Sequence, residues 1–257
     1  MFGLTRRDLR PELLDQPGVP EEVHYGALSD LKRVNSICRT GSIAWKTLAP
    51  LARSTDSRPL EVLDLACGGG DVLLDLRRRA ARTGTVLKLT GCDMSETAID
   101  YARRRASADD ANRSDLEIDF RVCDVFENFP RERFDVVMCS LFLHHLDEDR
   151  AITLLKIMSR AARRLVFVND LIRCGWGYAA AQVVLRLMTR NHIVLADGPQ
   201  SVAGAFTLPE VRELVRKAGI ADARLRKIWP YRFLLSWTPP TQSHDPIAVG
   251  DASLALS

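Results

Sequence analysis

Three consecutive glycines that follow a short apolar run are the residues of this chain with the clearest chemical use. The segment 61–71 reads Glu-Val-Leu-Asp-Leu-Ala-Cys-Gly-Gly-Gly-Asp, and its apolar positions predict a short buried strand. An amphipathic pattern begins at Asp71 and predicts a helix directly after the turn. Glycines let the backbone turn tightly and let a ligand approach main-chain N–H groups. Because the start of the following helix favours a ligand with negative or acceptor character, the segment predicts the cofactor corner of a doubly wound α/β domain.

Two carboxylates and a hydroxyl lie at the ends of the next predicted strands. A strand over 87–94 carries Asp93, a strand over 118–123 is followed by Asp124, and a strand over 134–140 ends at Ser140. A carboxylate roughly 20 residues beyond a glycine turn suits a ribose diol, because it can accept hydrogen bonds from both hydroxyls. Acids that follow strand after strand at βαβ spacing indicate a single ligand site at one edge of a sheet.

The order of acid and glycines separates two classes of cofactor. A dinucleotide fingerprint needs G-x-G-x-x-G, whereas here Asp64 precedes three glycines in a row. The pattern resembles motif I of the class I S-adenosylmethionine-dependent methyltransferases, and the resemblance covers about residues 60–240. It implies S-adenosyl-L-methionine as cofactor and S-adenosyl-L-homocysteine as product, with Asp93 at the ribose and Asp124 at the adenine amino group. The cofactor residues expected on this basis are Asp64, Ala66, Cys67, Gly68, Gly70, Asp93, Met94, Asp124, Val125 and Ser140.

The resemblance also implies a fold, a Rossmann-like α/β domain. Its sheet has seven strands, mostly parallel, with helices on both faces and one antiparallel strand near the C-terminus. The remaining apolar runs supply candidates for the last elements, namely a fifth strand over 164–168, a helix over 207–217, and strands over 223–228 and 232–237. The last two strands are expected to pair antiparallel.

Segments outside this core carry further predicted helices. Helices over about 21–34 and 43–52 form an N-terminal helical cap, which in this family often closes over cofactor and substrate; the alternative is that they only cover the edge of the sheet. An apolar helix over 178–188 lies in a connection that is long for a βα loop. It could shape an apolar substrate pocket, dock on a membrane surface or pack on the core. The expected organisation is a cap (1–58), a cofactor-binding domain (59–240) with a substrate-side insertion (171–206), and a mobile tail (241–257).

A histidine pair follows the fourth predicted strand and supplies the candidate catalytic base. Methyl transfer from a sulfonium is an in-line displacement, so the protein must hold the acceptor and handle the proton of a hydroxyl. His144 is the preferred base because it lies just beyond the strand end, and its spacing from Ser140 resembles that of small-molecule methyltransferases, including phosphoethanolamine methyltransferases. The alternative is that His144 or His145 packs over the cofactor or caps the next helix. His145 is the less favoured base, since adjacent residues are expected to point to different sides.

Polar residues that end the fifth predicted strand are candidates for contact with the acceptor. Asn169 is assigned to substrate binding, and Asp170 and Arg173 to the catalytic group. Asp170 could instead cap the next element or pair with Arg173. His192, on the insertion, is a substrate-side residue and an alternative base, with a surface position equally open. No metal ligand set is assigned: the fourth strand end has no acid, and Asn169 and Asp170 offer only one pair of oxygen ligands.

Four short segments point to a narrower group of enzymes. The segments 10–15, 169–173, 197–201 and 230–232 together resemble a bacterial methyltransferase subfamily associated with type III polyketide or phenolic lipid biosynthesis. That subfamily commonly has two arginines after the serine that corresponds to Ser201, where this chain has Ala203-Gly204. The resemblance implies O-methylation of a small, partly apolar phenolic or polyketide-type hydroxyl. The alternatives are C-methylation of a quinone-like ring, a nicotinamide-dependent oxidoreductase, and a cofactor-binding protein that does not methylate.

Composition, net charge and cysteine pattern limit the class of protein and the kinds of partner that are expected. With 257 residues, 46% of them hydrophobic, the chain can form one substantial core, and a net charge of +3 implies no general polyanion partner, so no nucleic acid is expected. Six cysteines without a C-x-x-C pair indicate reduced thiols rather than a zinc site. No signal peptide and no apolar run long enough to span a bilayer are evident, so a cytoplasmic enzyme with a small-molecule acceptor is expected. The sequence gives no signal for an oligomeric state.

Overall fold

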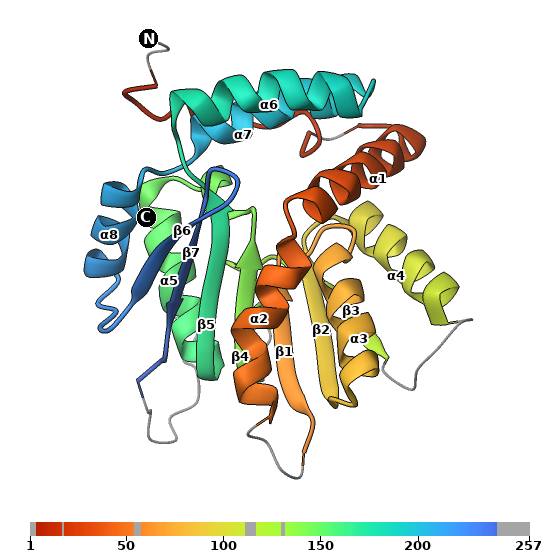
Figure 1. Cartoon of the computed structure of the whole chain (residues 1–257), viewed down its shortest axis with the longest axis vertical. Helices are drawn as coiled ribbons and strands as arrows, with labels where there is room; N and C mark the ends of the chain where they lie inside the picture. Colours follow the sequence, from red (N-terminus) through yellow and green to blue (C-terminus); the bar gives the residue numbers. More distant parts are fainter. Residues whose placement is uncertain (1–3, 17, 54–57, 111–116, 130–131, 241–257) are drawn as a thin grey trace, which may run out of the picture.

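A seven-stranded sheet forms the centre of the molecule, with helices on both faces (Figure 1). The computed structural model describes residues 4–16, 18–53, 58–110, 117–129 and 132–240. The strand order is β3 (Ile118–Val122), β2 (Leu87–Asp93), β1 (Leu60–Leu65), β4 (Phe134–Ser140), β5 (Ala162–Leu171), β7 (Arg232–Trp237) and β6 (Arg224–Ile228). Strands β1 to β5 are parallel, and β7 runs antiparallel to both β5 and β6. The predicted fold class is therefore confirmed.

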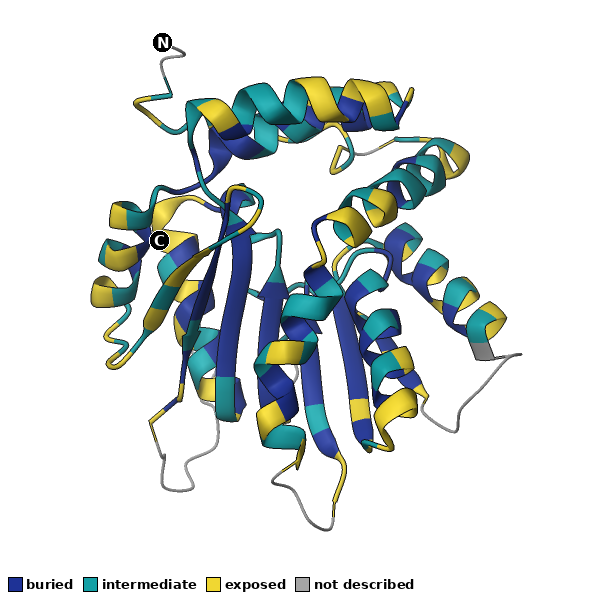
Figure 2. Cartoon of the chain, viewed as in Figure 1, coloured by how far each residue is buried: buried dark blue, intermediate teal, exposed yellow. Residues whose placement is uncertain are grey.

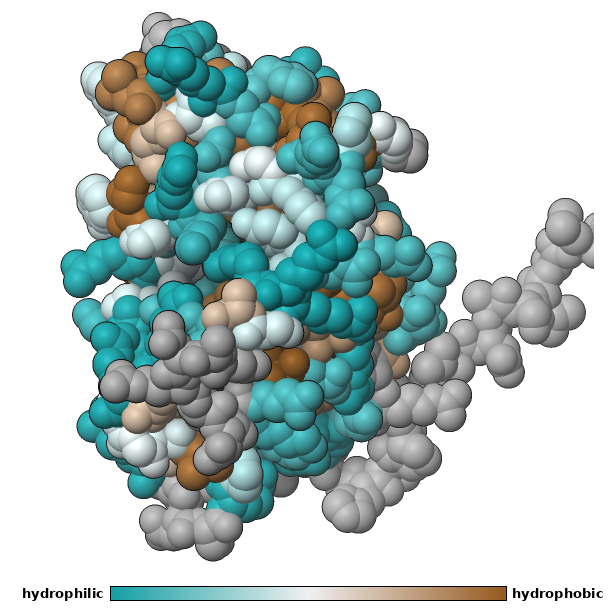
Figure 3. All heavy atoms as spheres, turned by 90° about the vertical axis from the view of Figure 1, so that its right-hand side faces the viewer, coloured by the Kyte–Doolittle hydropathy of each residue, from teal (hydrophilic) through white to brown (hydrophobic). Residues whose placement is uncertain are grey.

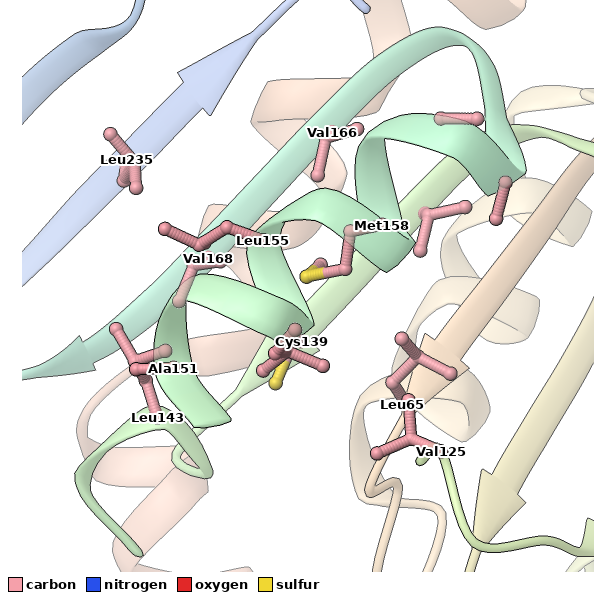
Figure 4. Packing of buried hydrophobic residues seen from close by; sticks show 14 of the residues in the cluster. Leu65, Val125, Cys139, Leu143, Ala151, Leu155, Met158, Val166, Val168 and Leu235 are labelled. Carbon is pink, nitrogen blue, oxygen red and sulfur yellow. The ribbon is translucent and has the colours of Figure 1, made fainter. Parts of the chain in front are cut away.

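Two apolar clusters hold helices to opposite faces of the sheet. One face packs against α2 (Thr40–Arg53), α3 (Asp71–Thr83) and α4 (Glu96–Asp110), and the other against α5 (Glu148–Ala161) and α8 (Leu208–Lys217). Figure 4 shows the second cluster, where Leu155 and Met158 of α5 lie against Cys139 and Val168 of β4 and β5. Each such side chain contributes about 1.5–3 kcal/mol when fully buried. The central strands are accordingly buried along most of their length, whereas the helices are buried on one side only (Figure 2).

Strand register decides which side chains share a face at the carboxyl ends of the strands. Asp64 pairs with Met138, and Ser140 pairs with Asn169. Because side chains alternate along a strand, Asp64, Ser140 and Asn169 lie on the same face of the sheet. Asp170, the next residue along β5, lies on the other face. Two neighbouring polar regions therefore arise at one edge of the sheet.

Strand β5 is longer than the sequence predicts. It continues to Leu171, since Asn169 and Asp170 pair with Leu234 and Phe233 of the antiparallel strand β7. The expectation that polar residues end the fifth strand after Val168 was therefore wrong. A neighbouring strand satisfies their backbone groups, so polar side chains do not interrupt the ladder.

Two helices, rather than one, make up most of the segment between β5 and α8. Helix α6 (Gly175–Met188) is followed by α7 (His192–Gly204), which the sequence analysis did not predict and which contains Pro199. Both helices lie beyond the carboxyl edge of the sheet (Figure 1). Large apolar side chains of α6, including Trp176 and Leu187, are exposed, and Figure 3 shows apolar patches toward the end of the molecule where these helices lie. Within the described residues, no helix is both long and apolar enough to cross a membrane.

The N-terminal part is an extended segment followed by two helices. Residues 4–16, the N-terminal strap, contain no helix, and α1 (Glu21–Ile37) precedes α2. The strap lies along α7: Asp8 donates its backbone N–H to Ala203, and the N–H groups of Leu13 and Leu14 donate to the carboxylate of Asp197. The predicted mobile tail, residues 241–257, lies outside the described residues.

Candidate functional site

The glycine turn between β1 and α3 has a backbone that only small residues tolerate well. Positive φ angles occur at Ala66 (52°), Gly68 (51°) and Gly70 (72°). A Cβ on Gly70 would meet the ring of Phe120 at 2.8 Å, so this position accepts no side chain. A Cβ on Gly68, by contrast, would have no neighbour within 4 Å. The turn is therefore packed on one side and open to a ligand on the other.

Asp93 is held against this turn by backbone hydrogen bonds. Its Oδ2 accepts from the N–H of Gly68 at 2.8 Å, and its Oδ1 accepts from the N–H of Ser95 at 2.9 Å. Each carboxylate oxygen keeps acceptor capacity for a further donor. Burial raises the pKa of Asp93, against the opposing effect of the two N–H groups. The structure thus brings Gly68 and Asp93 together with the free side of the carboxylate available to a diol.

The remaining predicted cofactor residues lie on the same edge. Asp124 follows β3, where its Oδ1 accepts from the N–H of Phe126 at 2.8 Å, and Val125 beside it is buried. Met94, after β2, is 70% exposed. Cys67 lies in the turn, and its N–H donates to the carbonyl of Cys92 at 3.0 Å.

Three side chains on one face of the sheet have buried polar atoms without a hydrogen-bond partner. Among the described residues, these include Oδ1 of Asp64, Oγ of Ser140, and both amide atoms of Asn169, which we call the unpaired polar set. Burial, and secondarily the charge of Asp93, raises the pKa of Asp64 well above its usual range. An unsatisfied buried polar group costs about 1–3 kcal/mol. Such a group in a folded protein calls for an explanation, of which a ligand is one.

On the opposite face of the sheet, His144 and Asp170 form a buried pair. The Nδ1 of His144 lies 2.7 Å from Oδ1 of Asp170, and the backbone N–H of His144 donates to Oδ2. The two side chains are 5% and 1% exposed. Burial opposes a charged imidazole, but Asp170 and Glu12 outweigh it and raise the pKa of His144 to about 10. His144 in turn holds the pKa of Asp170 below its usual value despite burial.

Glu12 of the strap reaches both histidines. Its Oε1 lies 3.6 Å from Nε2 of His144, and its Oε2 lies 3.8 Å from Nε2 of His145. The Nδ1 of His145 lies 3.1 Å from Asp15. The expectation that the adjacent histidines point to different sides was wrong, because a 3₁₀ turn (Leu143–His145) places their ring centroids 4.3 Å apart. We call Glu12, His144, His145 and Asp170 the histidine cluster.

The other predicted acceptor residues lie apart from this cluster. Arg173 is buried, and its guanidinium binds the carboxylate of Glu210 at 2.7 and 3.0 Å and the carbonyls of Leu4 and Ala205. The alternative pairing of Asp170 with Arg173 is not what the structure shows, since Asp170 binds His144. His192 is exposed at the first position of α7.

Glu12, Asp15 and Asp197 were not among the predicted site residues. Asp197 positions the strap, and Glu12 accepts a hydrogen bond from Ser201 of α7. All three lie in segments 10–15 and 197–201, which the subfamily resemblance singled out without assigning roles to these acids. These residues meet the histidines through tertiary contacts between distant segments.

Comparison with known proteins places the chain among methyltransferases. A family described as a methyltransferase domain matches residues 62–164. The ubiquinone biosynthesis O-methyltransferase of Neisseria meningitidis serogroup C (strain 053442) is 36% identical over 175 residues, which are 66% of this chain and 68% of that protein. Methyltransferase tpcH of Aspergillus fumigatus is 40% identical over 100 residues, covering 38% of this chain and 32% of that protein.

Solved methyltransferases share the fold at low sequence identity. The plantazolicin methyltransferase BamL, in complex with a triazolic desmethylPZN analog and SAH, has a TM-score of 0.61 and 15% identity, with 85% of this chain and 90% of that chain covered. Magnesium protoporphyrin IX methyltransferase from Synechocystis PCC 6803 with bound SAH has a TM-score of 0.56 and 17% identity, with 88% and 90% covered. At these identities the likeness concerns the fold alone.

The polar groups at the sheet edge fit S-adenosylmethionine. The open side of Gly68 leaves room for the ligand, and the carboxylate of Asp93 keeps acceptor capacity for ribose hydroxyls. The unpaired oxygens of Asp64 and Ser140 suit the polar methionine end of the cofactor. Together with the match to the Neisseria relative, these features establish that the chain belongs to the class I S-adenosylmethionine-dependent methyltransferases.

Proposed function

We propose that this methyltransferase transfers a methyl group to the hydroxyl oxygen of a small, partly apolar acceptor of the phenolic or polyketide type. The observation that carries the proposal is the buried His144–Asp170 pair directly after β4. It lies at the same edge of the sheet as the unpaired polar set, but on the other side of the strands. An acceptor between the two regions would have its hydroxyl beside an imidazole and its methyl donor beside Asp64 and Ser140.

The names of related proteins support oxygen as the methylated atom. Several relatives, from Neisseria, Bradyrhizobium and Coxiella, are named ubiquinone biosynthesis O-methyltransferases. The apolar character of the acceptor is supported by the half-buried and exposed aliphatic side chains of α6, which lies beyond the sheet edge. The resemblance of four short segments to enzymes of phenolic lipid biosynthesis narrows the acceptor to an aromatic or polyketide hydroxyl.

Each polar residue has a separate task in this proposal. S-adenosylmethionine, when bound, supplies the activated methyl group. Asp64 and Asp93 hold the two ends of the donor, and Asn169 offers a free amide to the acceptor. Asp170 fixes Nδ1 of His144 and leaves Nε2 for the acceptor side. The hydroxyl proton must leave as the oxygen–carbon bond forms. Because its raised pKa keeps the imidazole of His144 charged near neutral pH, the carboxylate of Glu12 beside Nε2 takes the proton, and the charged imidazole stabilises the developing oxyanion.

The strap must yield for an acceptor to reach Nε2 of His144. Glu12 occupies the space beside that nitrogen, and it is held by Ser201 and by the neighbouring contacts of Leu13 and Leu14 with Asp197. An acceptor hydroxyl therefore inserts between Glu12 and His144 or displaces the strap locally. Either way the strap becomes one wall of the acceptor site.

A panel of acceptors tests the proposal. Purified protein is incubated with S-adenosylmethionine and with catechols, resorcinols bearing alkyl tails, and polyketide-type phenols; S-adenosylhomocysteine and the methylated product are measured by mass spectrometry and NMR. We expect a methyl ether, formed faster with an apolar tail than without one. A product methylated on ring carbon would contradict O-methylation. Cofactor binding without turnover of any panel member would contradict the acceptor class.

A further inference from the structure

An N-terminal carboxylate and two adjacent histidines bring metal-binding atoms together in the histidine cluster. One ring nitrogen each of His144 and His145 and a carboxylate oxygen of Glu12 lie within 4.8 Å of one another. His144 is buried, and the side chains of Glu12 and His145 are 13% and 23% exposed. The atoms thus converge in a partly enclosed position at the carboxyl edge of the sheet, between the strap and the turn that follows β4.

The distances suit an ion better than direct hydrogen bonds. Nε2 of His144 and of His145 lie 3.6 and 3.8 Å from the oxygens of Glu12, whereas an N–H···O hydrogen bond spans about 2.7–3.2 Å. Two ligands of a tetrahedral zinc ion with bonds of about 2.0–2.1 Å lie roughly 3.4 Å apart. The two contacts involve different oxygens of Glu12, so the carboxylate can meet an ion shared by both imidazoles through one oxygen or through both.

Both imidazoles are already oriented as metal-binding histidines usually are. The Nδ1 of His144 contacts Asp170 at 2.7 Å, and the Nδ1 of His145 contacts Asp15 at 3.1 Å. A histidine that binds a metal through one ring nitrogen usually donates the other N–H to a carboxylate, which fixes its tautomer and orientation. In this cluster the two Nδ1 atoms are occupied, and the two Nε2 atoms turn toward Glu12.

The charges around the site also favour a cation. Three carboxylates, those of Glu12, Asp15 and Asp170, surround the two imidazoles. Two of these carboxylates, those of Glu12 and Asp170, are largely buried, where negative charge is costly unless it is compensated. A divalent cation at the Nε2 atoms supplies that compensation and links the strap to the turn after β4.

We propose that Glu12, His144 and His145 form a binding site for a divalent transition-metal cation of the zinc class. Two imidazole nitrogens and one carboxylate oxygen match the ligands of this class rather than those of magnesium or calcium. Three protein ligands leave a fourth position open, as in catalytic zinc sites. No metal ligand set was predicted from the cysteines or the strand ends, because the carboxylate of this site comes from the distant N-terminal strap.

The site suggests how the histidine cluster acts on the acceptor. A hydroxyl bound at the fourth position of the cation loses its proton more readily, because the cation stabilises the oxyanion. With the cation bound, Nε2 of His144 would hold the ion instead of contacting the hydroxyl, and the hydroxyl proton would pass to solvent water. This role rests on the proposed O-methylation, whereas the cation site itself does not.

Metal titration of the tag-free, full-length protein tests the site. The protein is treated with a chelator and titrated with Zn²⁺ by calorimetry and with Co²⁺ by visible absorption, which reports tetrahedral coordination. We expect one ion per chain. Glu12→Gln and His145→Gln should each weaken its binding at least tenfold, and Asp170→Asn by about 10–100-fold, the usual loss for a carboxylate that orients a metal-binding histidine. Glu213→Gln, which removes an exposed carboxylate paired with Arg216, is the matched control and should bind as the parent protein does.

The outcomes separate the site from the proposed function. Cofactor affinity and thermal melting first establish that each variant is folded. Absence of the Co²⁺ spectrum, or equal binding in the parent, Glu12→Gln and His145→Gln proteins, would overturn the site and assign any bound ion to thiols or to the surface. One-site binding with an unchanged methyl-transfer rate in metal-free protein would keep the site and overturn its role in activating the acceptor. One-site binding without methylation of any hydroxyl would keep the site and contradict the proposed function.

Discussion

The two polar regions at the carboxyl edge of the sheet differ in how their buried side chains are paired. On the face of the glycine turn, the proposed cofactor side, Asp64, Ser140 and the neighbouring Asn169 have polar atoms without a partner among the described residues. On the acceptor side, His144 pairs with Asp170, His145 with Asp15, and Glu12 accepts from Ser201. Both regions are built at the ends of β4 and β5, so strand position alone does not account for the difference.

The difference follows from which segments reach each region. The N-terminal strap and α7 supply the partners of the histidine cluster, whereas no described side chain completes the unpaired polar set. The polar groups of the cofactor side are therefore in place before a ligand binds. Hydrogen bonds to a bound ligand offset the free-energy cost of leaving these groups unpaired. The acceptor side is closed by the protein's own groups, so an acceptor or an ion must exchange contacts with the strap. We expect tight cofactor binding to a rigid cradle and acceptor binding coupled to movement of residues 4–16.

The largest expected effect comes from breaking the acceptor side alone. His144→Ala should lower the rate of methyl transfer by about 10²–10⁴-fold, the usual contribution of a group that assists proton removal. The dissociation constant of S-adenosylmethionine should change little, because His144 lies on the other face from Asp64 and Ser140. Turnover is measured by formation of S-adenosylhomocysteine, and affinity by calorimetry. A loss of affinity for S-adenosylmethionine as large as the loss of methyl-transfer rate would show that the two regions do not act independently.

The cofactor side provides the next largest effect. Asp64→Asn keeps the size of the side chain but removes its charge, and a hydrogen bond to a charged group contributes about 1.5–3 kcal/mol. We therefore expect the affinity for S-adenosylmethionine to fall by about 10–100-fold. The free energy of unfolding without cofactor should hardly fall, since Oδ1 of Asp64 has no partner to lose. Calorimetry and urea unfolding measure the two quantities. Unchanged affinity, or a large loss of stability, would show that Asp64 is a structural rather than a ligand-binding group.

This contrast also explains what could be predicted from the sequence. The strand, glycine turn and helix of the cofactor side are contiguous, and Asp93 follows at the spacing of a βαβ unit, so local patterns suffice. The seven-stranded sheet was expected from the family resemblance, for which the apolar runs supplied candidate strands. His144 could be proposed because it lies four residues beyond the end of an apolar strand, at a spacing from Ser140 that resembles that of small-molecule methyltransferases.

The acceptor side depends on contacts that no local pattern encodes. Leu13 and Asp197 are 184 residues apart, yet their hydrogen bond places Glu12 beside the histidines. Arg173 was assigned to catalysis from its place after the fifth strand, but its guanidinium binds Glu210 of α8. The end of β5 was misplaced because the antiparallel partner β7 comes from the far end of the chain. In each of these three cases, a contact with a segment distant in the sequence determines where the residue or strand end lies.

The smallest expected effect concerns the pH dependence of stability in the cofactor-free protein. Burial raises the pKa of Asp64 well above its usual range. In the pH range above its unfolded value of about 3.9, the folded chain therefore binds more protons at this position than the unfolded chain does. Stability contributed by this group accordingly falls as pH rises through that window.

Replacing Asp64 isolates this contribution from those of the other acids. The side chain in Asp64→Asn cannot titrate. The free energy of unfolding of this variant should therefore increase relative to that of the parent protein as pH rises from about 4 toward neutrality. Urea unfolding at several pH values measures the difference between the two proteins. Saturating S-adenosylmethionine should reduce that difference, because a ligand that pairs with the carboxylate favours its charged form. A difference independent of pH would mean that Asp64 is already paired in solution, and the contrast between the two regions would then not hold.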